Sequence, residues 1–303
     1  MISGEKILVT GVSGSVAGPL ARYLAPDNDV WGIARFADAA PRQALEDAGI
    51  TTRAVDLGEG DLSDVPDDFT YVLHLAWTRA DLSQLEASLR TNVEGAGLVL
   101  QHCHKAKAAL VMSGMGVYSP SPDPWHLYTE TDPVGRAATA YAATSPASKL
   151  GLEAVARFCA RAFDLPITIT RLNTFMGVPA SFPGMHIGAV LADKPIIAPF
   201  DPNPHSPIHV DDMAWQLEAL LDAASTTACI TNWCGDEVTT VQEWVQWASE
   251  WSGVPGTLEV REVPCSPTGA SADPTRRQSI TGPCRTNFQE SYRALYESMT
   301  DAS

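Results

Sequence analysis

The chain has 303 residues, of which 45% are hydrophobic, and its formal net charge is −16. This length and composition suit one large α/β domain or a domain with a smaller lobe. The acidic balance argues against nucleic acids and anionic membrane surfaces as partners. No stretch approaches the ~20 continuous apolar residues of a membrane span, and no signal peptide fits before the first expected strand, so we expect a cytoplasmic protein.

The six cysteines are dispersed, and no two of them form a Cys-x-x-Cys pair. This usage is typical of reduced thiols rather than of a disulfide framework. His102, Cys103 and His104 are consecutive, but no companion cluster of ligands accompanies them. We interpret this segment as a helix with solvated histidines and expect no metal site.

The segment at residues 7–18 reads ILVTGVSGSVAG and carries the most informative pattern in the chain. Its first three residues form the apolar run of a buried parallel strand. Gly11 permits a tight turn, Gly14 has no Cβ and lets a pyrophosphate approach the backbone, and Ala17 allows close helix packing. The N–H groups at the start of the next helix would face the phosphates. We expect a dinucleotide to contact Gly11, Ser13, Gly14, Ser15 and Val16.

Apolar runs alternate with segments of helical period through residue 171. Strands are expected at residues 7–9, 29–34, 51–57, 71–75, 109–113 and 167–171. Helices are expected after the glycine turn, at residues 82–103 and at residues 145–163. This alternation predicts a doubly wound parallel α/β sheet of the Rossmann type, with ligands beyond the carboxyl ends of the strands.

The composition shifts beyond residue 171, where residues 177–207 are rich in proline and glycine. We expect irregular structure there, followed by a helix at 208–223, a short strand at 229–233 and a helix at 241–251. Three tryptophans, spaced by three and four residues, share one face of that last helix and predict a buried core stripe.

Two lobes follow from this pattern. We expect a dinucleotide-binding Rossmann domain at residues 1–175, to which residues 208–235 return. Residues 176–207 and 236–303 would form a smaller C-terminal lobe that binds substrate.

The residues after the second and third expected strands bear on the choice of dinucleotide. NAD-preferring proteins place an acidic residue after the second strand, whereas this chain has Ala34 followed by Arg35. A guanidinium suits a 2′-phosphate, so we expect NADP, with NAD as the alternative and a solvated loop arginine as the simpler interpretation. Asp56, followed by Leu57, is placed to accept a hydrogen bond from an adenine amino group.

Several further motifs carry a family resemblance when they are taken in order. They are Thr10-Gly11-x-x-Gly14-x-x-Ala17, His74-Leu75-Ala76, Asn92-Val93-x-Gly95, Val117-Tyr118, Ser148-Lys149 with Glu153, Arg171 and His209-Val210-Asp211-Asp212. With these motifs the chain resembles the extended short-chain dehydrogenases/reductases, the group of nucleotide-sugar epimerases, dehydratases and related ketone reductases.

The resemblance implies a set of roles. Lys149 would hold the nicotinamide ribose, and Leu75, Ala76 and Asn173 would contact the cofactor. A tyrosine four residues before the lysine would give or take the proton, and a Ser or Thr hydroxyl would polarise the substrate oxygen. The resemblance also implies a homodimer formed through two helices that flank the sheet.

The chain departs from that pattern at both acid–base positions. Ser145 stands four residues before Lys149, where the tyrosine belongs. Gly114 takes the place of the hydroxyl residue, and Ser113 lies one residue earlier. A serine hydroxyl is too weak an acid to replace a phenol at neutral pH, and loss of a positioned general acid costs ~10²–10⁴-fold in rate.

Three hypotheses follow from this departure. The first is an NADP-dependent oxidoreductase that acts on a small carbonyl or hydroxyl compound, with Tyr118 or Tyr141 as the proton donor through a water held by Ser145. The second is a non-redox lyase, isomerase or epimerase that reuses the pocket. Its polar groups would be Lys149, His186, His209 and Asp211. The third is a catalytically silent protein that binds NADP.

Two groups of residues bear on the substrate. A nucleotide sugar would need cations for its two phosphates, and the C-terminal lobe offers Arg261, Arg276, Arg277 and Arg285. A neutral, fairly apolar carbonyl compound fits the net acidity and one apolar stretch better. That stretch contains Leu172, Phe175, Met176, Phe182, Met185 and Ile187.

Overall fold

The computed structural model describes residues 2–37, 39–135, 143–261 and 269–301. Tyr141, one of the two phenols considered as proton donors, lies outside the described residues. The chain divides into two compact units. Unit 1 comprises Met1–Val117, Ala142–Arg171 and Ala214–Thr231, and unit 2 comprises Tyr118–Tyr141, Leu172–Met213 and Asn232–Ser303.

The main sheet has seven strands and confirms the expected α/β, doubly wound class. In spatial order the strands are β11 (Cys229–Trp233), β6 (Ile167–Leu172), β5 (Ala108–Gly114), β4 (Tyr71–His74), β1 (Lys6–Thr10), β2 (Asp29–Ala34) and β3 (Thr51–Ala54). The neighbouring strands from β3 across to β5 pair in parallel. The chain runs outward from β1 through β2 to β3 and then returns to β4 on the other side of β1. This reversal is a topological switch point, where open α/β sheets bind ligands.

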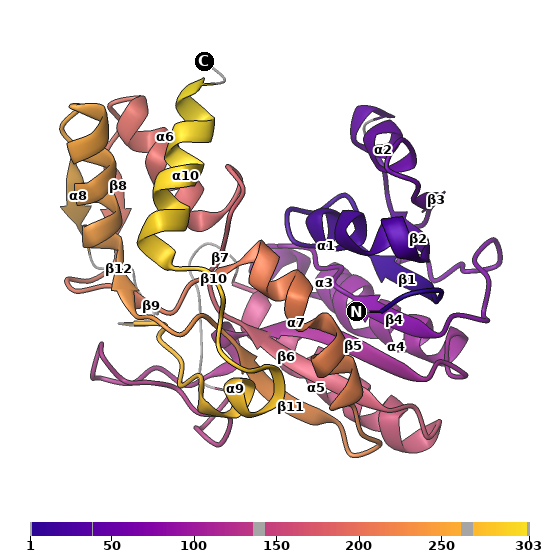
Figure 1. The fold of residues 1–303 in the computed structure, drawn as a ribbon. Helices are drawn as coiled ribbons and strands as arrows, with labels where there is room; N and C mark the ends of the chain where they lie inside the picture. Colours follow the sequence, from indigo (N-terminus) through magenta and orange to yellow (C-terminus); the bar gives the residue numbers. More distant parts are fainter. Residues whose placement is uncertain (1, 38, 136–142, 262–268, 302–303) are drawn as a thin grey trace. The chain divides into compact units, whose positions relative to one another are not determined.

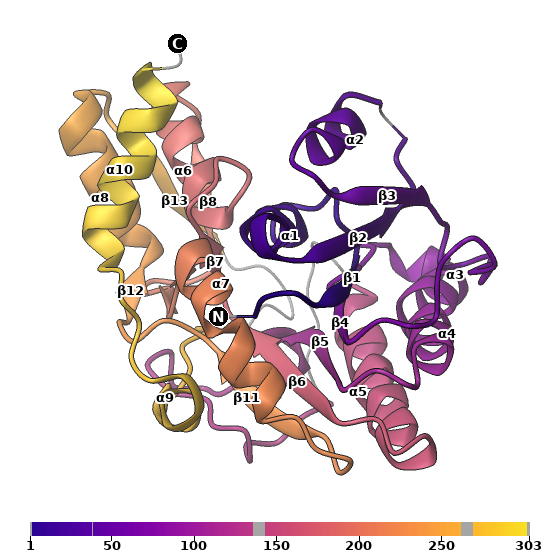
Figure 2. The ribbon, with the colours of Figure 1, turned by 45° about the vertical axis from the view of Figure 1, so that its right-hand side comes forward.

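Helices cover the sheet of unit 1. Its helical segments are α1 (Ala17–Leu24), η1 (Ala25–Asp27), α2 (Ala39–Glu46), η2 (Leu82–Gln84), α3 (Leu85–Leu89), η3 (Arg90–Glu94), α4 (Gly95–His102), η4 (Met115–Val117) and α5 (Ser145–Ala162). Helices α4 and α5 pack side by side (Figure 1, Figure 2). Helix α7 (Val210–Asp222) divides between the two units. None of the described helices is long and apolar enough to cross a membrane.

One local prediction in unit 1 was confirmed and one was wrong. The expected helix at residues 82–103 is confirmed as an unbroken run of helical segments from Leu82 to His102, whose middle turn is the π-helical η3 with the buried Asn92. The Asn92 amide pairs with the backbone N–H and C=O of Thr78, a tertiary contact that the apolar period does not encode. The third strand ends at Ala54 rather than at residue 57, because Asp56 accepts a hydrogen bond from the Gly58 N–H and forms a turn.

Unit 2 is built from helices and short strand pairs. The helices are α6 (Phe182–Leu191), α8 (Val241–Ser252), α9 (Thr275–Thr281) and α10 (Phe288–Asp301). The strand pairs are β7 (Phe175–Met176) with β10 (Ile208–His209), β9 (Pro204–His205) with β12 (Thr239–Thr240), and β8 (Ile196–Ala198) with β13 (Leu258–Val260). Helices α6, α8 and α10 lie side by side (Figure 1, Figure 2). Trp244 is fully buried and Trp247 and Trp251 pack against the same core, which confirms the predicted stripe.

The irregular structure expected at residues 177–207 was partly wrong, since α6 occupies ten of these residues. Ser181 caps the helix by accepting a hydrogen bond from the Gly184 N–H, and Pro183 lies in the first turn, where a missing N–H is tolerated. Ile187 and Val190 are then buried in the core of unit 2. The prolines that suggested a loop follow the helix instead of interrupting it.

Candidate functional site

The turn between β1 and α1 has the geometry that a dinucleotide requires. Gly11 has a φ of 70°, and a Cβ at this position would lie 2.7 Å from the Ala76 Cα. The loop residues Ser13, Gly14 and Ser15 are exposed. Helix α1 begins without a side-chain cap and without an acidic residue in its first turn. An exposed glycine turn beside an uncapped helix start fits the phosphates of a dinucleotide.

A buried threonine joins the two strands at the switch point. Thr10 Oγ1, at the end of β1, accepts hydrogen bonds from the N–H groups of Leu75 and Ala76 at 3.1 and 3.0 Å. It also lies 3.1 Å from His74 Nδ1. Because both acceptor positions of the hydroxyl are then filled, its own proton is donated to Nδ1. The backbone of Leu75 and Ala76 is thereby fixed beside the glycine turn.

His74 is a neutral imidazole in this arrangement. The ring is buried, and burial together with the charge of Lys149 lowers its pKa to about 3. With Nδ1 as the acceptor, the ring proton resides on Nε2, which has no hydrogen-bond partner among the described residues. His74 is therefore a fixed, uncharged element of the site rather than a proton carrier at neutral pH.

Lys149 is held in a buried position on α5. Its Nζ donates a hydrogen bond to the Met112 carbonyl oxygen at 2.7 Å, and the ammonium lies 5.2 Å from the centroid of a Trp77 ring. Only 6% of the residue is exposed. Burial lowers the pKa of Lys149 to about 7, against the opposing influence of Glu153. The amine is thus able to hold or release a proton near neutral pH.

Ser113, next to the lysine's acceptor, contacts a buried ion pair. Its hydroxyl donates to Glu153 Oε1 at 2.7 Å. Arg171 Nε and Nη2 donate to the two oxygens of the same carboxylate at 3.0 and 2.9 Å. All three side chains are buried. Because the Ser113 hydroxyl donates its proton to Glu153, it can form a hydrogen bond with a further group only by accepting one.

The start of α5 is tied to the segment that follows β4. Thr144 is fully buried, and its hydroxyl donates to the Ala80 carbonyl at 2.9 Å and accepts from Ser88 Oγ at 3.1 Å. Ser145, the first residue of the helix, is half-buried. Lys149 and Ser145 therefore lie one turn apart on a helix whose beginning is anchored.

The remaining predicted cofactor residues of unit 1 follow its outer strands. Arg35 comes directly after β2 and is exposed. Asp56 is exposed and already accepts the Gly58 N–H. Leu57 packs in the apolar core, so its backbone rather than its side chain is available to a ligand.

Two of the predicted site residues that the structure describes, Tyr118 and Asn173, belong to unit 2. Tyr118 is 3% exposed, its hydroxyl donates to Asn232 Oδ1 at 2.7 Å, and its ring stacks on that of Tyr128. The Asn173 amide donates to the Ala270 carbonyl, and its oxygen accepts the Ser206 N–H at 3.2 Å. Both side chains are committed to contacts within unit 2.

Of the polar residues considered for a non-redox reaction, Lys149 belongs to unit 1, and His186, His209 and Asp211 belong to unit 2. His209 Nδ1 accepts the Asp211 N–H at 3.2 Å and lies 3.4 Å from the Asp211 carboxylate. His186 is buried beside the rings of Phe182 and Trp244, and burial lowers its pKa to about 4.

Some residues that the sequence suggested as substrate contacts are buried and cannot contact a substrate. Arg277 is fully buried and forms an ion pair with Asp236, so its selection as a phosphate ligand was wrong. Met176 and Ile187 are buried in the core of unit 2, whereas Met185 is half-exposed.

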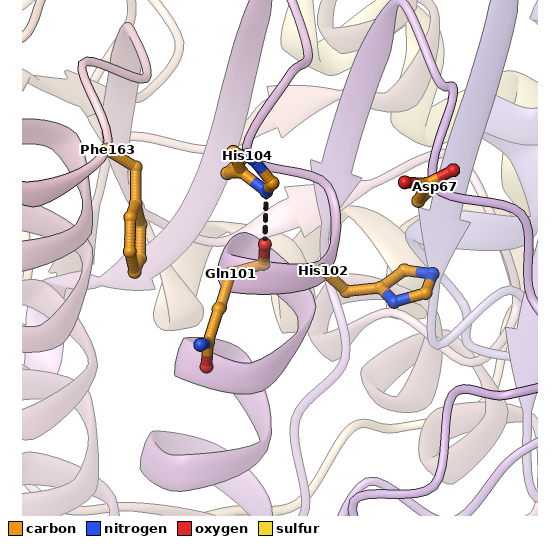
Figure 3. Close-up of a pocket in the computed structure, with 5 residues that line it drawn as sticks. All are labelled: Asp67, Gln101, His102, His104 and Phe163. Carbon is orange, nitrogen blue, oxygen red and sulfur yellow. Dashed lines mark hydrogen bonds between the residues drawn. The ribbon is translucent and has the colours of Figure 1, made fainter.

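A surface pocket of unit 1 lies away from these residues. Figure 3 shows its lining by Asp67, Gln101, His102, His104 and Phe163. His102 Nε2 lies 2.8 Å from the Val65 carbonyl and His104 Nδ1 lies 2.8 Å from the Gln101 carbonyl, and the two rings lie apart (Figure 3). Helix α4 ends at His102, so His104 lies in the turn before β5 rather than in the predicted helix. The pocket is therefore near the start of β5, whereas Met112 and Ser113 are at its end.

Sequence reasoning missed several contributors to the site. Trp77 contributes the face of its ring and Met112 contributes its backbone carbonyl. Contacts of these two kinds have no recognisable sequence motif. Thr144 had a signal, because a threonine placed just before a Ser-Pro helix start is a typical helix boundary.

Comparisons with known proteins show the family of the chain and its fold. A model of the NAD dependent epimerase/dehydratase family matches residues 7–226. No curated protein sequence shows a significant match to the chain.

Solved structures share the fold over nearly the whole chain. A variant of UDP-glucuronic acid 4-epimerase from Bacillus cereus is 21% identical, with a TM-score of 0.85 over 98% of this chain and 100% of that one. UDP-N-acetylglucosamine 4-epimerase from Methanobrevibacter ruminantium is 18% identical, with a TM-score of 0.84 over 100% of both chains. The dTDP-glucose 4,6-dehydratase of Streptomyces venezuelae is 17% identical, with a TM-score of 0.81 over 98% of this chain and 97% of that one. At these identities the likeness shows the fold.

Proposed function

The chain belongs to the NAD dependent epimerase/dehydratase family, and we propose that it is an NADP-dependent oxidoreductase with a non-standard proton donor. It would interconvert a hydroxyl and a carbonyl group on a small molecule. The observation that carries the proposal is Lys149, which is buried, hydrogen-bonded to the end of β5 and able to titrate near neutral pH.

Residues of unit 1 would hold the dinucleotide. The exposed turn at Ser13 and Gly14 and the uncapped start of α1 suit the pyrophosphate. Arg35 is exposed directly after β2 and suits a 2′-phosphate, which supports NADP over NAD. When bound, the nicotinamide ring supplies a hydride acceptor or donor.

Lys149 has N–H groups that do not bond to the Met112 carbonyl, and these could contact the cofactor or a catalytic phenol. One of its three N–H groups is directed to the Met112 carbonyl, and two are left for the ribose hydroxyls or a phenol. A cation at this point lowers the pKa of a neighbouring phenol and so favours proton exchange with the substrate oxygen.

Tyr141 is the phenol we propose for that proton. The Tyr118 hydroxyl is buried and already donates to Asn232, so it is less suited to donate to a substrate. Tyr141 lies four residues before Ser145, which itself lies four residues before Lys149. A water held by the Ser145 hydroxyl would connect the phenol to the substrate oxygen.

A nucleotide-sugar epimerase is the second candidate, and the comparisons favour it. The Bacillus cereus enzyme was solved with a UDP-linked sugar acid and NAD, and the Methanobrevibacter ruminantium enzyme with UDP-N-acetylmuramic acid. Of the arginines considered for the phosphates, Arg277 is committed to an ion pair with Asp236. The other candidates within the described residues are Arg261, Arg276 and Arg285.

Binding and turnover assays separate these proposals. Calorimetry with NADPH and NADH should show 1:1 binding and a preference for NADPH. Absorbance at the nicotinamide band then reports consumption of NADPH with a panel of ketones, aldehydes and UDP-sugars. Conversion of a UDP-sugar without net NADPH consumption would favour the epimerase.

The proton donor is tested by single substitutions. Y141F should lower turnover ~10²-fold or more, and Y118F should retain most activity. If both variants turn over like the parent protein, the assignment of the donor is wrong. Product formed without any dinucleotide would support a non-redox reaction instead. Binding of NADPH without any reaction would indicate a silent binding protein.

A further inference from the structure

Glu153 occupies an unusual position for a charged side chain. It lies one helical turn after Lys149 on α5, and only 5% of it is exposed. Its carboxylate accepts two hydrogen bonds from Arg171 on β6 and one from Ser113 on β5. A buried carboxylate persists only when such bonds satisfy it. One side chain thus joins the helix of the lysine to two central strands of the sheet.

The bond to Ser113 bears directly on the lysine. The carbonyl that accepts the Lys149 hydrogen bond belongs to Met112, and its peptide plane continues into Ser113. Fixing the Ser113 side chain therefore fixes the direction of that carbonyl. Gly114 and η4 follow, so Ser113 provides the last side-chain anchor of the strand before the chain turns away.

Three groups bear on the charge of the lysine besides its acceptor. Glu153 on its own helix favours the charged amine, while the neutral His74 on β4 and the Trp77 ring add no net charge. Arg171 on β6 forms an ion pair with Glu153. Among these three groups, Glu153 is therefore the one whose neutralisation removes a negative charge that favours the ammonium.

We propose that Glu153 and Ser113 are positioning residues for Lys149: the carboxylate holds Ser113, and Ser113 holds the Met112 carbonyl against the ammonium. This inference rests on the proposed function for its catalytic meaning, but its geometry concerns the apo protein alone. If Glu153 contributed only to stability, its ion pair with Arg171 would be sufficient, and the hydrogen bond from Ser113 would not be needed.

The titration of Lys149 provides a readout that needs no cofactor. The free energy of unfolding is measured from pH 4 to pH 10 for each variant and for the same variant carrying Lys149→Met. The difference between the two curves gives the midpoint of the Lys149 titration in the folded protein. In the parent protein this midpoint should lie at about pH 7.

Glu153→Gln should shift that midpoint downward by ~1 unit, because the amine loses the negative charge that favours its protonated form. Glu297→Gln is the matched control, since Glu297 forms an exposed pair with Arg293 on α10. It should leave the midpoint unchanged. A midpoint in E153Q equal to that of the parent protein would overturn the electrostatic part of the inference.

Ser113→Ala keeps the Glu153–Arg171 pair and so covers the case in which E153Q does not fold. It should also lower the midpoint, because a less fixed carbonyl supports the charged amine less well. Ser113→Thr retains the hydroxyl and should restore the parent value. An unchanged midpoint in S113A, or equal shifts in S113A and S113T, would overturn the inference.

Calorimetry with NADPH connects the inference to function. S113A should weaken NADPH binding ~3–10-fold and S113T should not, since one hydrogen bond is worth about 1 kcal/mol. If the parent protein binds no NADPH, the proposed function fails, while the midpoints still decide whether Glu153 and Ser113 position the lysine.

Discussion

Replacing Lys149 by methionine should stabilise the protein at neutral pH, although it removes a hydrogen bond. The lysine is 6% exposed, and its Nζ has the Met112 carbonyl as acceptor. Methionine has a similar length and no charge, so it fills the same space without the cost of burying an ammonium.

The magnitude follows from the displaced pKa of the lysine. Burial lowers this pKa from 10.5 to about 7. A displacement of that size corresponds to about 5 kcal/mol between the two protonation states, at 1.36 kcal/mol per unit. Leaving the Met112 carbonyl without its donor costs about 1–3 kcal/mol. The methionine variant should therefore be more stable by about 2–4 kcal/mol at pH 7 and below.

The advantage of the variant should disappear as the pH rises. Between pH 7 and 10.5 the unfolded chain binds the lysine proton while the folded chain does not, so the stability of the parent protein increases with pH in this window. The Lys149→Met variant lacks that increase. The two curves of unfolding free energy should cross between about pH 8 and pH 10, because the variant still lacks the hydrogen bond to the Met112 carbonyl when the lysine is neutral in the folded chain.

Urea denaturation followed by tryptophan fluorescence, at intervals from pH 6 to pH 10, measures both curves. Lys194→Met, at an exposed lysine, is the control and should give a curve parallel to that of the parent protein. Parallel curves for the parent protein and Lys149→Met would refute the reasoning, because they would show that Lys149 titrates alike in the folded and unfolded chains.

Three further predictions concern the dinucleotide turn. Gly11→Ala should abolish NADPH binding in calorimetry and lower the Tm, because its Cβ would lie 2.7 Å from the Ala76 Cα and the backbone has a φ of 70°; a variant that binds normally would contradict the turn geometry. Arg35→Glu should raise the Kd for NADPH ~10-fold or more and leave that for NADH nearly unchanged, and equal effects on both would remove the case for a 2′-phosphate. Thr10→Val should destabilise the protein by about 2–4 kcal/mol in urea denaturation, because two buried N–H groups lose their acceptor; a loss below about 0.5 kcal/mol would show that water replaces the hydroxyl.

Local pattern was sufficient for much of the fold. The strands at Asp29–Ala34 and Cys229–Trp233 have the predicted bounds, because most of their residues are apolar or β-branched and each is flanked by polar or glycine-containing segments. The glycine turn was equally readable, since Gly11 has the positive φ that its position requires. These features depend on residues within a few positions of one another.

Features that depend on tertiary contacts could not be predicted from the sequence. The π-helical turn at Asn92 is accompanied by an amide that pairs with Thr78, fourteen residues away. The bond from Ser113 to Glu153 spans 40 residues. Neither has a periodic signal, because the partner is chosen by the packing of the sheet and not by the neighbouring sequence.

The assignment of a proton donor was limited by a different cause. A side chain can be recognised from a motif only when it stands at the motif's position, and Ser145 stands where a tyrosine is expected. The hydroxyl of Tyr118 is engaged by Asn232, which the sequence does not show. The homodimer and the cytoplasmic location stay predictions of the sequence.

Titration of the purified protein with NADPH in a calorimeter measures whether a dinucleotide binds to unit 1. We expect one binding site per chain, with a Kd below ~10 μM, which corresponds to about −7 kcal/mol. We also expect weaker binding in Lys149→Met, since the amine is proposed to contact the ribose. If neither NADPH nor NADH gives a heat of binding, the protein is not a dinucleotide-dependent enzyme.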